Sequence, residues 1–229
     1  MTISAILFDK DGTLFQFGAT WEAWASAFLL RATEGDNVRA IHLGKAIGFD
    51  LPAGRFRPDS VVIAGTPAEV ADALVPHLPH MARNAVIDML NEEAEMAPQA
   101  EAVPLLPYLQ ALRAQGMRLG VATNDAESPA RAHLNAAGVA ECFDFVAGFD
   151  SGHGAKPAPG QLLAFSRAVN VPPAHVVMVG DSTHDLRAGR SAGMTTVGVL
   201  TGMARADELD PFADVVLPDI GHLPRWLGL

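Results

Sequence analysis

The sequence predicts an α/β protein: a doubly wound, Rossmann-like parallel sheet that carries an inserted helical cap domain. After residue 104, short apolar runs alternate with helical patterns, which is typical of parallel strands covered by helices on both faces. One further apolar run opens the chain, and a mostly helical stretch of about 80 residues separates it from the others. Apolar residues make up 49% of the 229 residues, enough for a sizeable core.

The N-terminal part of the chain predicts one strand followed by helices. Residues 3–8 form an apolar run that ends at two acids, Asp9 and Asp11. Residues 20–31 place tryptophan, phenylalanine and other apolar side chains at helical spacing, so we expect these aromatic residues to pack in a core. A Thr-Pro-Ala-Glu sequence beginning at Thr66 predicts the capped start of another helix.

The inserted region ends in a linker. A last predicted helix covers residues 81–96, and the stretch over residues 96–104 then carries the chain out of the region. A chain of this length suits one core and one smaller insert. We therefore expect a core domain formed by residues 1–15 and 100–229 and a helical cap domain formed by residues 16–99.

The C-terminal part alternates regularly between helices and strands, and glycines or prolines stand close to the ends of several elements. Its strands are continuous apolar runs, as expected for a parallel sheet buried on both faces. Helices are expected over residues 104–115, 159–169 and 183–192 and between Ser128 and Gly138, and strands over residues 118–122, 143–147, 176–179 and 195–200.

Charge and composition exclude several classes of protein. The formal net charge is −10 and no cluster of Lys and Arg is present, so we expect no nucleic-acid partner. Cys142 is the only cysteine, which excludes an intramolecular disulfide and a thiolate metal cluster. There is no signal-peptide pattern and no run of about 18 apolar residues, so we expect a soluble, cytoplasmic protein without a membrane partner.

Polar side chains follow the predicted strands at the points where these strands end. Ligands of open parallel sheets bind beyond the carboxyl ends of the strands. Polar residues in three such positions and in one Gly/Pro-rich loop are therefore candidates for one site: Asp9 and Asp11 after the first strand, Thr123 and Asn124 after residue 122, Asp181 and Asp185 after residue 180, and Lys156 in the loop.

Phosphate and metal chemistry explains this set of residues. Carboxylates gathered at one place repel one another unless a cation joins them, and oxygen ligands without thiolates favour Mg²⁺. Gly12 lets the backbone approach an anion closely, Thr123 can donate a hydrogen bond to a phosphoryl oxygen, and Lys156 offsets negative charge. One aspartate can attack phosphorus to give an aspartyl phosphate, while its neighbour two residues along shuttles the proton.

These motifs resemble, in residue type and in order, the four motifs of the haloacid dehalogenase-like hydrolase superfamily. They are Asp-Lys-Asp-Gly-Thr-Leu at residues 9–14, Thr123 after a strand, Lys156 in a Lys-Pro-x-Pro loop, and Gly-Asp-Ser-Thr-His-Asp at residues 180–185. The resemblance implies a Rossmann-like core and a Mg²⁺ cofactor.

The resemblance also implies a role for each motif residue. Asp9 resembles the nucleophile and a metal ligand, and Asp11 resembles the general acid/base, whose backbone carbonyl binds the metal. Thr123 resembles the phosphoryl hydrogen-bond donor, and Lys156 resembles the ammonium that orients Asp9 and the phosphate. The metal site is completed by Asp181 as a direct ligand and by Asp185, directly or through water; Asn124 is a weaker candidate for a substrate contact.

Asp11 distinguishes the subclasses of this superfamily. Its dehalogenases lack an acid at this position, and its cation-pumping ATPases carry Thr there and need membrane helices. An acid here can protonate a leaving alcohol and later activate water, which is typically worth about 10²–10⁴ in rate. Asp11 therefore favours a phosphatase.

The position of the insertion matches the helical cap of the phosphoglycolate phosphatase-like branch. Such caps often supply a basic residue that holds a substrate carboxylate. The matching region contains Lys45, Arg55 and Arg57, each at least as well explained as a solvated surface charge, and Lys45 and Arg55 are the candidates for substrate binding. Two departures weaken the assignment of a specific substrate: residues 15–17 lack the branch's usual polar pair, and Gly160 stands where Asp is usual.

The expected function is therefore a Mg²⁺-dependent phosphomonoester hydrolase that acts on a small phosphorylated metabolite, with 2-phosphoglycolate as the substrate suggested by the resemblance. A sugar-phosphate phosphatase and a phosphomutase of the same superfamily are the alternatives. A phospho-receiver signalling module also combines acids, Thr and Lys on a parallel sheet. It is disfavoured because receivers need about half of this chain length.

Overall fold

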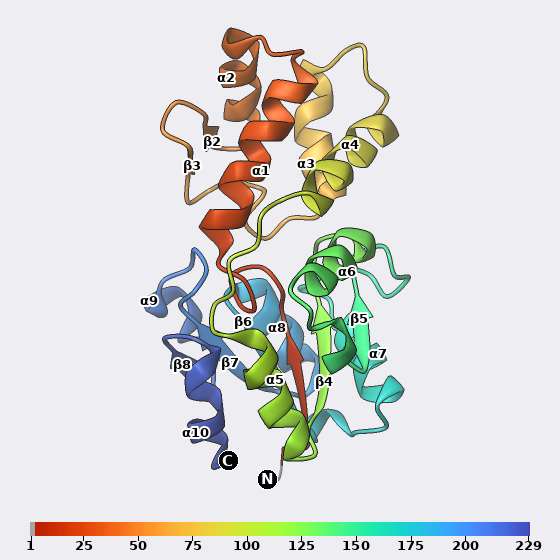
Figure 1. Ribbon diagram of the computed structural model, residues 1–229, viewed down its shortest axis with the longest axis vertical. Helices are drawn as coiled ribbons and strands as arrows, with labels where there is room; N and C mark the ends of the chain where they lie inside the picture. Colours follow the sequence, from red (N-terminus) through yellow and green to blue (C-terminus); the bar gives the residue numbers. More distant parts are fainter. Residues whose placement is uncertain (1–2) are drawn as a thin grey trace. The chain divides into compact units, whose positions relative to one another are not determined.

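The computed structural model describes residues 3–229, which fall into two compact units (Figure 1). The α/β unit comprises the residues up to Phe17 together with Gln99–Leu229, and the helical unit comprises Gly18–Pro98. The chain therefore leaves the α/β unit after its first strand and returns 81 residues later. That the helical unit acts as a cap stays a prediction.

Six parallel strands form the sheet of the α/β unit, in the order β5-β4-β1-β6-β7-β8. The predicted doubly wound parallel sheet is confirmed. The first strand lies in the middle, hydrogen-bonded to β4 on one side and to β6 on the other. The strands are β1 (Ala5–Phe8), β4 (Arg118–Ala122), β5 (Phe145–Ala147), β6 (Val176–Gly180), β7 (Thr195–Val199) and β8 (Val215–Leu217).

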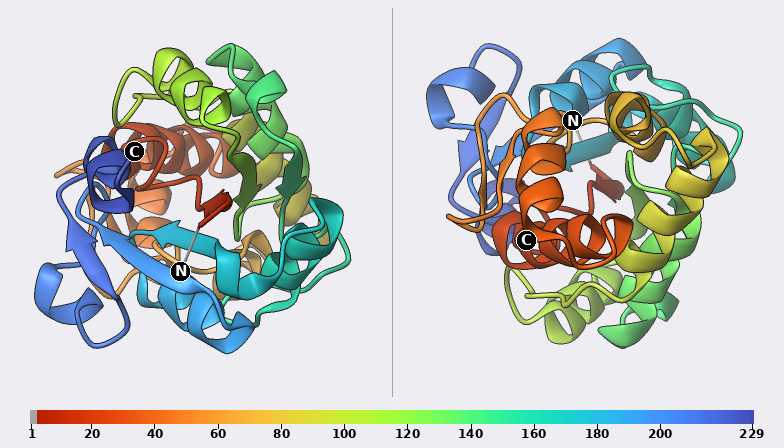
Figure 2. Two further views of the ribbon diagram at one scale, coloured as in Figure 1. Left: turned by 90° about the horizontal axis from the view of Figure 1, so that it is seen from below. Right: turned by 90° about the horizontal axis from the view of Figure 1, so that it is seen from above.

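Helices cover both faces of this sheet because alternate residues of each buried strand point to opposite sides. Ile6 and Phe8 belong to the apolar cluster that α5 and α10 join, whereas Ala5 and Leu7 belong to the cluster that α7 and α8 join. Figure 2 shows α5 and α8 on opposite sides of the strands. The helices are α5 (Leu105–Ala114), α6 (Glu127–Ala136), α7 (Gly160–Ala168), α8 (Thr183–Ala192), α9 (Ala206–Leu209) and α10 (Leu223–Leu227).

The helical unit is built around an aromatic cluster. Trp24 stacks on Phe28 and meets Trp21 edge to face, and its indole N–H donates to the Leu90 carbonyl at 3.1 Å. All three rings are buried, as predicted for core residues. The elements of this unit are α1 (Phe17–Ala32), α2 (Asn37–Ala46), α3 (Pro67–Leu74), α4 (Arg83–Glu95) and an antiparallel pair, β2 (Phe49–Asp50) and β3 (Arg55–Phe56).

Two helices begin at capping boxes. Thr66 accepts a hydrogen bond from the Glu69 amide and the Glu69 carboxylate accepts one in return, so the predicted start of α3 is confirmed. Ser182 and Asp185 make the same reciprocal pair at the start of α8. Single 3₁₀ turns occur at Val75–His77, Ala140–Cys142, Pro173–His175 and Ile220–His222. None of the helices in residues 3–229 has both the length and the apolar character of a membrane span.

Asp144 ties the start of β5 to β4 and α5, and its loss is expected to destabilise the α/β unit. Its carboxylate accepts from the Leu119 amide at 3.0 Å and from Arg113 and Arg118 at 3.1 Å each. Partial burial acts to raise the pKa of Asp144, but these donors outweigh it and lower the pKa. Asp144→Ala should therefore lower the free energy of unfolding by about 2 kcal/mol at neutral pH.

The sign of this pKa shift predicts a pH dependence. A carboxyl whose pKa is lower in the folded state stabilises the protein above its unfolded pKa, and this contribution disappears as the pH falls through the folded value. Urea unfolding measures the free energy of unfolding of wild type and of Asp144→Ala. The difference between the two free energies should shrink as the pH falls below 3.8, the ordinary pKa of Asp. A difference that stays constant down to about pH 2.5 would contradict this role for the charge.

Candidate active site

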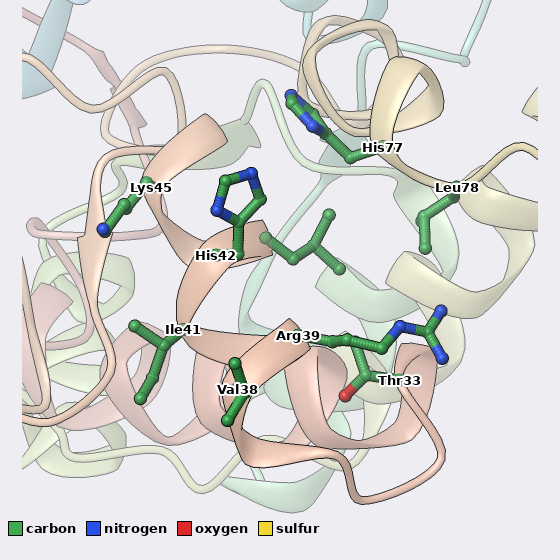
Figure 3. Close-up of a pocket in the computed structure, with 9 residues that line it drawn as sticks. Thr33, Val38, Arg39, Ile41, His42, Lys45, His77 and Leu78 are labelled. Atoms are coloured by element: carbon green, nitrogen blue, oxygen red, sulfur yellow. The ribbon is translucent and has the colours of Figure 1, made fainter.

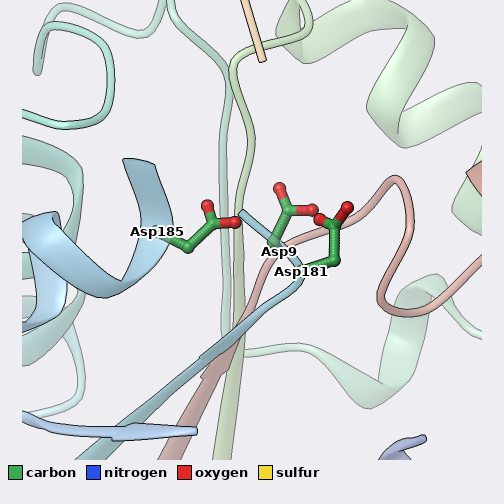
Figure 4. A group of neighbouring side chains, drawn as sticks. All are labelled: Asp9, Asp181 and Asp185. Carbon is green, nitrogen blue, oxygen red and sulfur yellow. The ribbon is translucent and has the colours of Figure 1, made fainter. Parts of the chain in front are cut away.

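Three buried carboxylates meet at the carboxyl edge of the sheet. Asp9 directly follows β1, Asp181 directly follows β6, and Asp185 lies in the first turn of α8. Each offers one oxygen within 4.8 Å of the others, and Figure 4 shows the carboxylates turned toward one another. The parallel sheet produces this arrangement because adjacent strands β1 and β6 end at the same edge.

Lys156 lies within the same cluster. Its ammonium donates to Asp9 Oδ1 and Asp185 Oδ1, each at 2.6 Å, and to the Ala122 carbonyl at 2.7 Å. An ammonium has three protons, so all of them have acceptors. Burial acts to lower the pKa of Lys156, but Asp185 and Asp9 outweigh it and raise the pKa. The lysine is therefore charged and held between two of the carboxylates.

Asn124 holds the main chain of Lys156. Its amide nitrogen donates to the Lys156 carbonyl at 2.9 Å, and its amide oxygen accepts from the Lys156 N–H at 2.8 Å. This reciprocal pair fixes the loop of Lys156 to the end of β4. The predicted contact of Asn124 with a substrate stays a prediction.

The charge of the cluster suits a divalent cation. If all three carboxylates are ionised, their charges and that of the ammonium sum to −2. Burial, with help from Asp185 and Asp11, raises the pKa of Asp9 to about 7 against the opposing effect of Lys156. Burial and the charges of Asp9 and Asp185 raise the pKa of Asp181 well above its ordinary value. Buried oxygen ligands with uncompensated negative charge fit Mg²⁺.

Gly12 and Gly202 leave the space that Asp181 occupies. Gly12 has φ +82°, and a Cβ on either glycine would collide with the Asp181 carboxylate. Gly202 lies in the loop after β7, where Thr201 also donates a hydrogen bond to the Gly12 carbonyl at 2.6 Å. This loop was not predicted to contribute to the site. It supports the turn that carries Asp11 and Gly12.

Gly202→Ala is expected to displace the Asp181 carboxylate and to weaken Mg²⁺ binding by about 10- to 100-fold, the usual effect of disturbing the support of a metal ligand. Titration calorimetry with Mg²⁺ measures this. Gly18→Ala is the control, because its Cβ would meet nothing nearer than the Glu22 carboxyl at 3.8 Å. Equal Mg²⁺ affinity in the two variants would contradict the view that Gly202 makes room for a metal-binding Asp181 carboxylate.

Thr123 can still donate a hydrogen bond. It lies after β4 with 2% of its surface exposed, and its hydroxyl oxygen accepts from the Asp125 amide at 3.0 Å. The single hydroxyl proton is left for another acceptor. A phosphoryl oxygen is a suitable acceptor for it.

Sequence reasoning missed a second buried lysine next to the site. The Lys10 ammonium lies 2.7 Å from Asp11 Oδ1, 3.3 Å from Asp125 Oδ2 and 2.9 Å from His133 Nδ1. The Lys10 side chain has no exposed surface. Asp125 and His133 had no recognisable signal in the sequence, because neither belongs to one of the four motifs.

The two predicted substrate residues of the inserted region both belong to the helical unit. Lys45 and His42 of α2 line a pocket of about 470 Å³, together with Arg39 and His77 (Figure 3). Arg55 lies in β3 and is not among the residues that line this pocket. The pocket is thus rich in groups that can bind an anion.

A sequence model of the haloacid dehalogenase-like hydrolases matches residues 3–193. The chain belongs to this family of hydrolases. Among curated relatives, the phosphoglycolate phosphatase of Rhodospirillum rubrum is 38% identical over 123 residues, which cover 54% of this chain and 51% of the relative. The phosphoglycolate phosphatase of Escherichia coli K12 is 34% identical over 122 residues, covering 53% of this chain and 48% of the relative. Each match thus spans about half of both proteins.

Solved structures share the fold along the whole chain. CbbY from Rhodobacter sphaeroides, solved in complex with phosphate, matches with a TM-score of 0.70 and 22% identity and covers 100% of both chains. A phosphatase of this family from Thermococcus onnurineus matches with a TM-score of 0.66 and 24% identity, covering 99% of this chain and 98% of the other.

Proposed function

We propose that this haloacid dehalogenase-like hydrolase is a Mg²⁺-dependent phosphatase that cleaves small phosphomonoesters through an aspartyl phosphate. The observation that carries the proposal is the buried cluster of Asp9, Asp181 and Asp185 around the Lys156 ammonium at the sheet edge. Relatives named phosphoglycolate phosphatase support it. So does the phosphate complex of the structural neighbour CbbY.

Asp9 is the nucleophile in this proposal. Lys156 engages Oδ1 of Asp9, which leaves Oδ2 to attack phosphorus. The new Oδ2–P bond forms as the ester P–O bond breaks, and the leaving oxygen takes a proton from Asp11. Water then attacks the aspartyl phosphate and gives its proton to Asp11, which releases phosphate and restores Asp9. Thr123 donates its free proton to a phosphoryl oxygen.

Asp9, Asp181 and the backbone carbonyl of Asp11 are the proposed direct ligands of Mg²⁺. Both oxygens of Asp185 already accept hydrogen bonds: Oδ1 from Lys156, and Oδ2 from the Ser182 amide at 3.1 Å and hydroxyl at 2.6 Å. This favours a contact of Asp185 with the metal through water. When bound, Mg²⁺ supplies charge neutralisation at the phosphoryl group.

The experiment that tests the function is a phosphate-release screen over 2-phosphoglycolate, sugar phosphates and nucleotides, with Mg²⁺ or with EDTA. We expect Mg²⁺-dependent release that is greatest for 2-phosphoglycolate. Greater release from a sugar phosphate would favour the sugar-phosphate phosphatase, and conversion between phosphate isomers without release would favour the mutase. An absence of turnover on every ester would refute the proposal.

The predicted cytoplasmic location stays a prediction.

Lys45 and Arg55 are proposed to bind the substrate's leaving group. Among the described residues of the helical unit, Arg31, Arg57 and Arg83 form ion pairs with carboxylates. Lys45 and Arg55 have no carboxylate within ion-pair distance among these residues. They are therefore available to an anion.

Arg55→Ala should raise KM for 2-phosphoglycolate by about tenfold, which corresponds to the loss of one charged hydrogen bond of about 1.4 kcal/mol. KM for nitrophenyl phosphate should change less, because this ester has no carboxylate. Lys45→Ala is tested in parallel. Arg83→Ala is the control, since Arg83 is already paired with Asp72. An equal rise for both substrates would contradict carboxylate binding.

A further inference from the structure

Lys10 separates the proposed nucleophile from the proposed acid/base in the sequence, yet it is fully buried. Lysine is almost never completely buried unless it is paired. Burial acts to lower the pKa of Lys10, but Asp11 and Asp125 outweigh it and raise the pKa. Lys10 is therefore an ammonium, held in place by groups that compensate for its lost hydration.

The partners of Lys10 come from three places in the fold, and two of them are more than 110 residues away from Lys10 in the sequence. Asp11 lies in the turn after β1, Asp125 follows β4, and His133 is in α6. His133 is 1% exposed, so the contact between its Nδ1 and Lys10 lies inside the protein. An ammonium only donates, so Nδ1 is the acceptor and the ring proton of a neutral His133 is on Nε2.

Asp125 anchors this group to the end of β4. Its Oδ1 accepts from the Ala126 amide at 2.8 Å, and its own amide donates to the Thr123 hydroxyl at 3.0 Å. The carboxylate that pairs with Lys10 is thus held by its own backbone segment. Lys10 consequently connects the Asp11 turn to the end of β4 and to α6.

The two buried lysines serve different carboxylates. Lys156 contacts Asp9 and Asp185, whereas Lys10 contacts Asp11 and Asp125. We propose that Lys10 is the positioning residue for Asp11: it engages Oδ1 and leaves Oδ2 to exchange the proton with the leaving oxygen and with water. This inference rests on the proposed phosphatase function. It adds that one ammonium group, Lys156, positions the nucleophile, whereas the other, Lys10, positions the acid/base.

If Lys10 positions only the acid/base, the effect of losing Lys10 on kcat/KM should depend on the leaving group. An alkyl phosphate needs a proton on its leaving oxygen, whereas nitrophenolate leaves without one. The test compares kcat/KM, which reports the steps up to departure of the leaving group, for glycerol phosphate and nitrophenyl phosphate. Lys10→Met should lower the value for glycerol phosphate at least about tenfold more than that for nitrophenyl phosphate. Asp11→Asn is the reference and should change the ratio in the same direction.

Lys10→Met leaves the Asp125 carboxylate buried without its cation, which can unfold the protein. The double variant Lys10→Met/Asp125→Asn removes that charge and still lacks the contact with Asp11. Circular dichroism and the melting temperature establish that the variants are folded. Arg131→Met is the control, because it loses an exposed ion pair with Glu127 on the same helix as His133.

A readout that needs no variant is the tautomer of His133 in the wild-type protein. Nitrogen-15 NMR should show the proton on Nε2 and a hydrogen-bonded Nδ1. A proton on Nδ1 would overturn the inference, because Lys10 could not then donate to that atom.

The kinetic outcomes separate the inference from the function. If kcat/KM of a folded Lys10→Met or double variant falls by the same factor for both esters, Lys10 has a merely structural role and the inference is overturned. Unchanged kcat/KM for both esters overturns it as well. In both cases wild-type turnover leaves the phosphatase function standing. A wild-type protein that cleaves neither ester, nor any ester of the screen, shows instead that the proposed function is wrong.

Discussion

Asp9→Asn is expected to abolish phosphate release, with kcat falling by more than about 10⁴-fold, because an amide oxygen is a poor nucleophile toward phosphorus. Single-turnover experiments with labelled substrate should also detect no phosphoryl-enzyme. The measurement is phosphate release with saturating Mg²⁺. Residual turnover within about tenfold of wild type would refute the nucleophile assignment.

The fold should tolerate this change. Burial raises the pKa of Asp9 to about 7, so the ionised carboxylate is unfavourable in the metal-free protein, and Asn resembles the neutral acid. Metal-free Asp9→Asn should melt no lower than wild type, and Mg²⁺ should stabilise it less. The control is Asp59→Asn, which makes the same chemical change at a side chain that is 73% exposed. It should keep full activity.

Lys156→Met should lower both activity and stability. The change removes the only ammonium that contacts Asp9 and Asp185 among the described residues, and it leaves two buried carboxylates facing each other. Breaking a buried ion pair costs about 3–5 kcal/mol. We expect this loss in urea unfolding of the metal-free protein, a smaller loss with Mg²⁺, and a fall in kcat of at least about 100-fold.

Arginine should not rescue this position. The Lys156 ammonium donates in three directions, to two carboxylates and to the Ala122 carbonyl, whereas a planar guanidinium directs its donors in one plane and is bulkier. Lys156→Arg should therefore be nearly as impaired as Lys156→Met. Wild-type activity in the arginine variant would show that only a positive charge is needed there.

The strands that carry the site could be predicted because buried parallel strands are continuous apolar runs. Residues 176–179 were predicted and β6 is Val176–Gly180, while residues 118–122 were predicted and β4 is Arg118–Ala122. Polar residues that directly follow such runs must lie at the sheet edge. For this reason the positions of Asp9, Thr123 and Asp181 at that edge followed from local patterns alone.

Other parts of the site have no local signal. Gly202 is needed because the Asp181 carboxylate, from another strand, fills the space beside it. Lys10 stands between two acids and has the pattern of an exposed charge; it is buried because Asp125 and His133 reach it from distant segments. Such requirements arise only when the chain is folded.

Two elements, β8 and α2, were not predicted from the sequence. The apolar pattern of β8 is too short, and the capping signal of α2 was present but was not used. Strand β8 has three residues, all half-buried, too few to show a period. Helix α2 begins at a cap that was recognisable: Asp36 accepts from the Val38 and Arg39 amides, and the acid stands directly before the helix.

The central place of β1 in the sheet has a consequence for biosynthesis. Phe8 pairs with Val121 and Val179, which the ribosome adds 113 and 171 residues later (121 − 8 and 179 − 8). Strand β1, which precedes the proposed nucleophile Asp9, therefore has no partner strand until most of these residues have been translated. Gly18–Pro98 is contiguous in the sequence and has no such delay. A nascent chain that stalls before Gly180 is translated would expose this apolar strand and be prone to aggregation, so we expect chaperones to bind it at this stage.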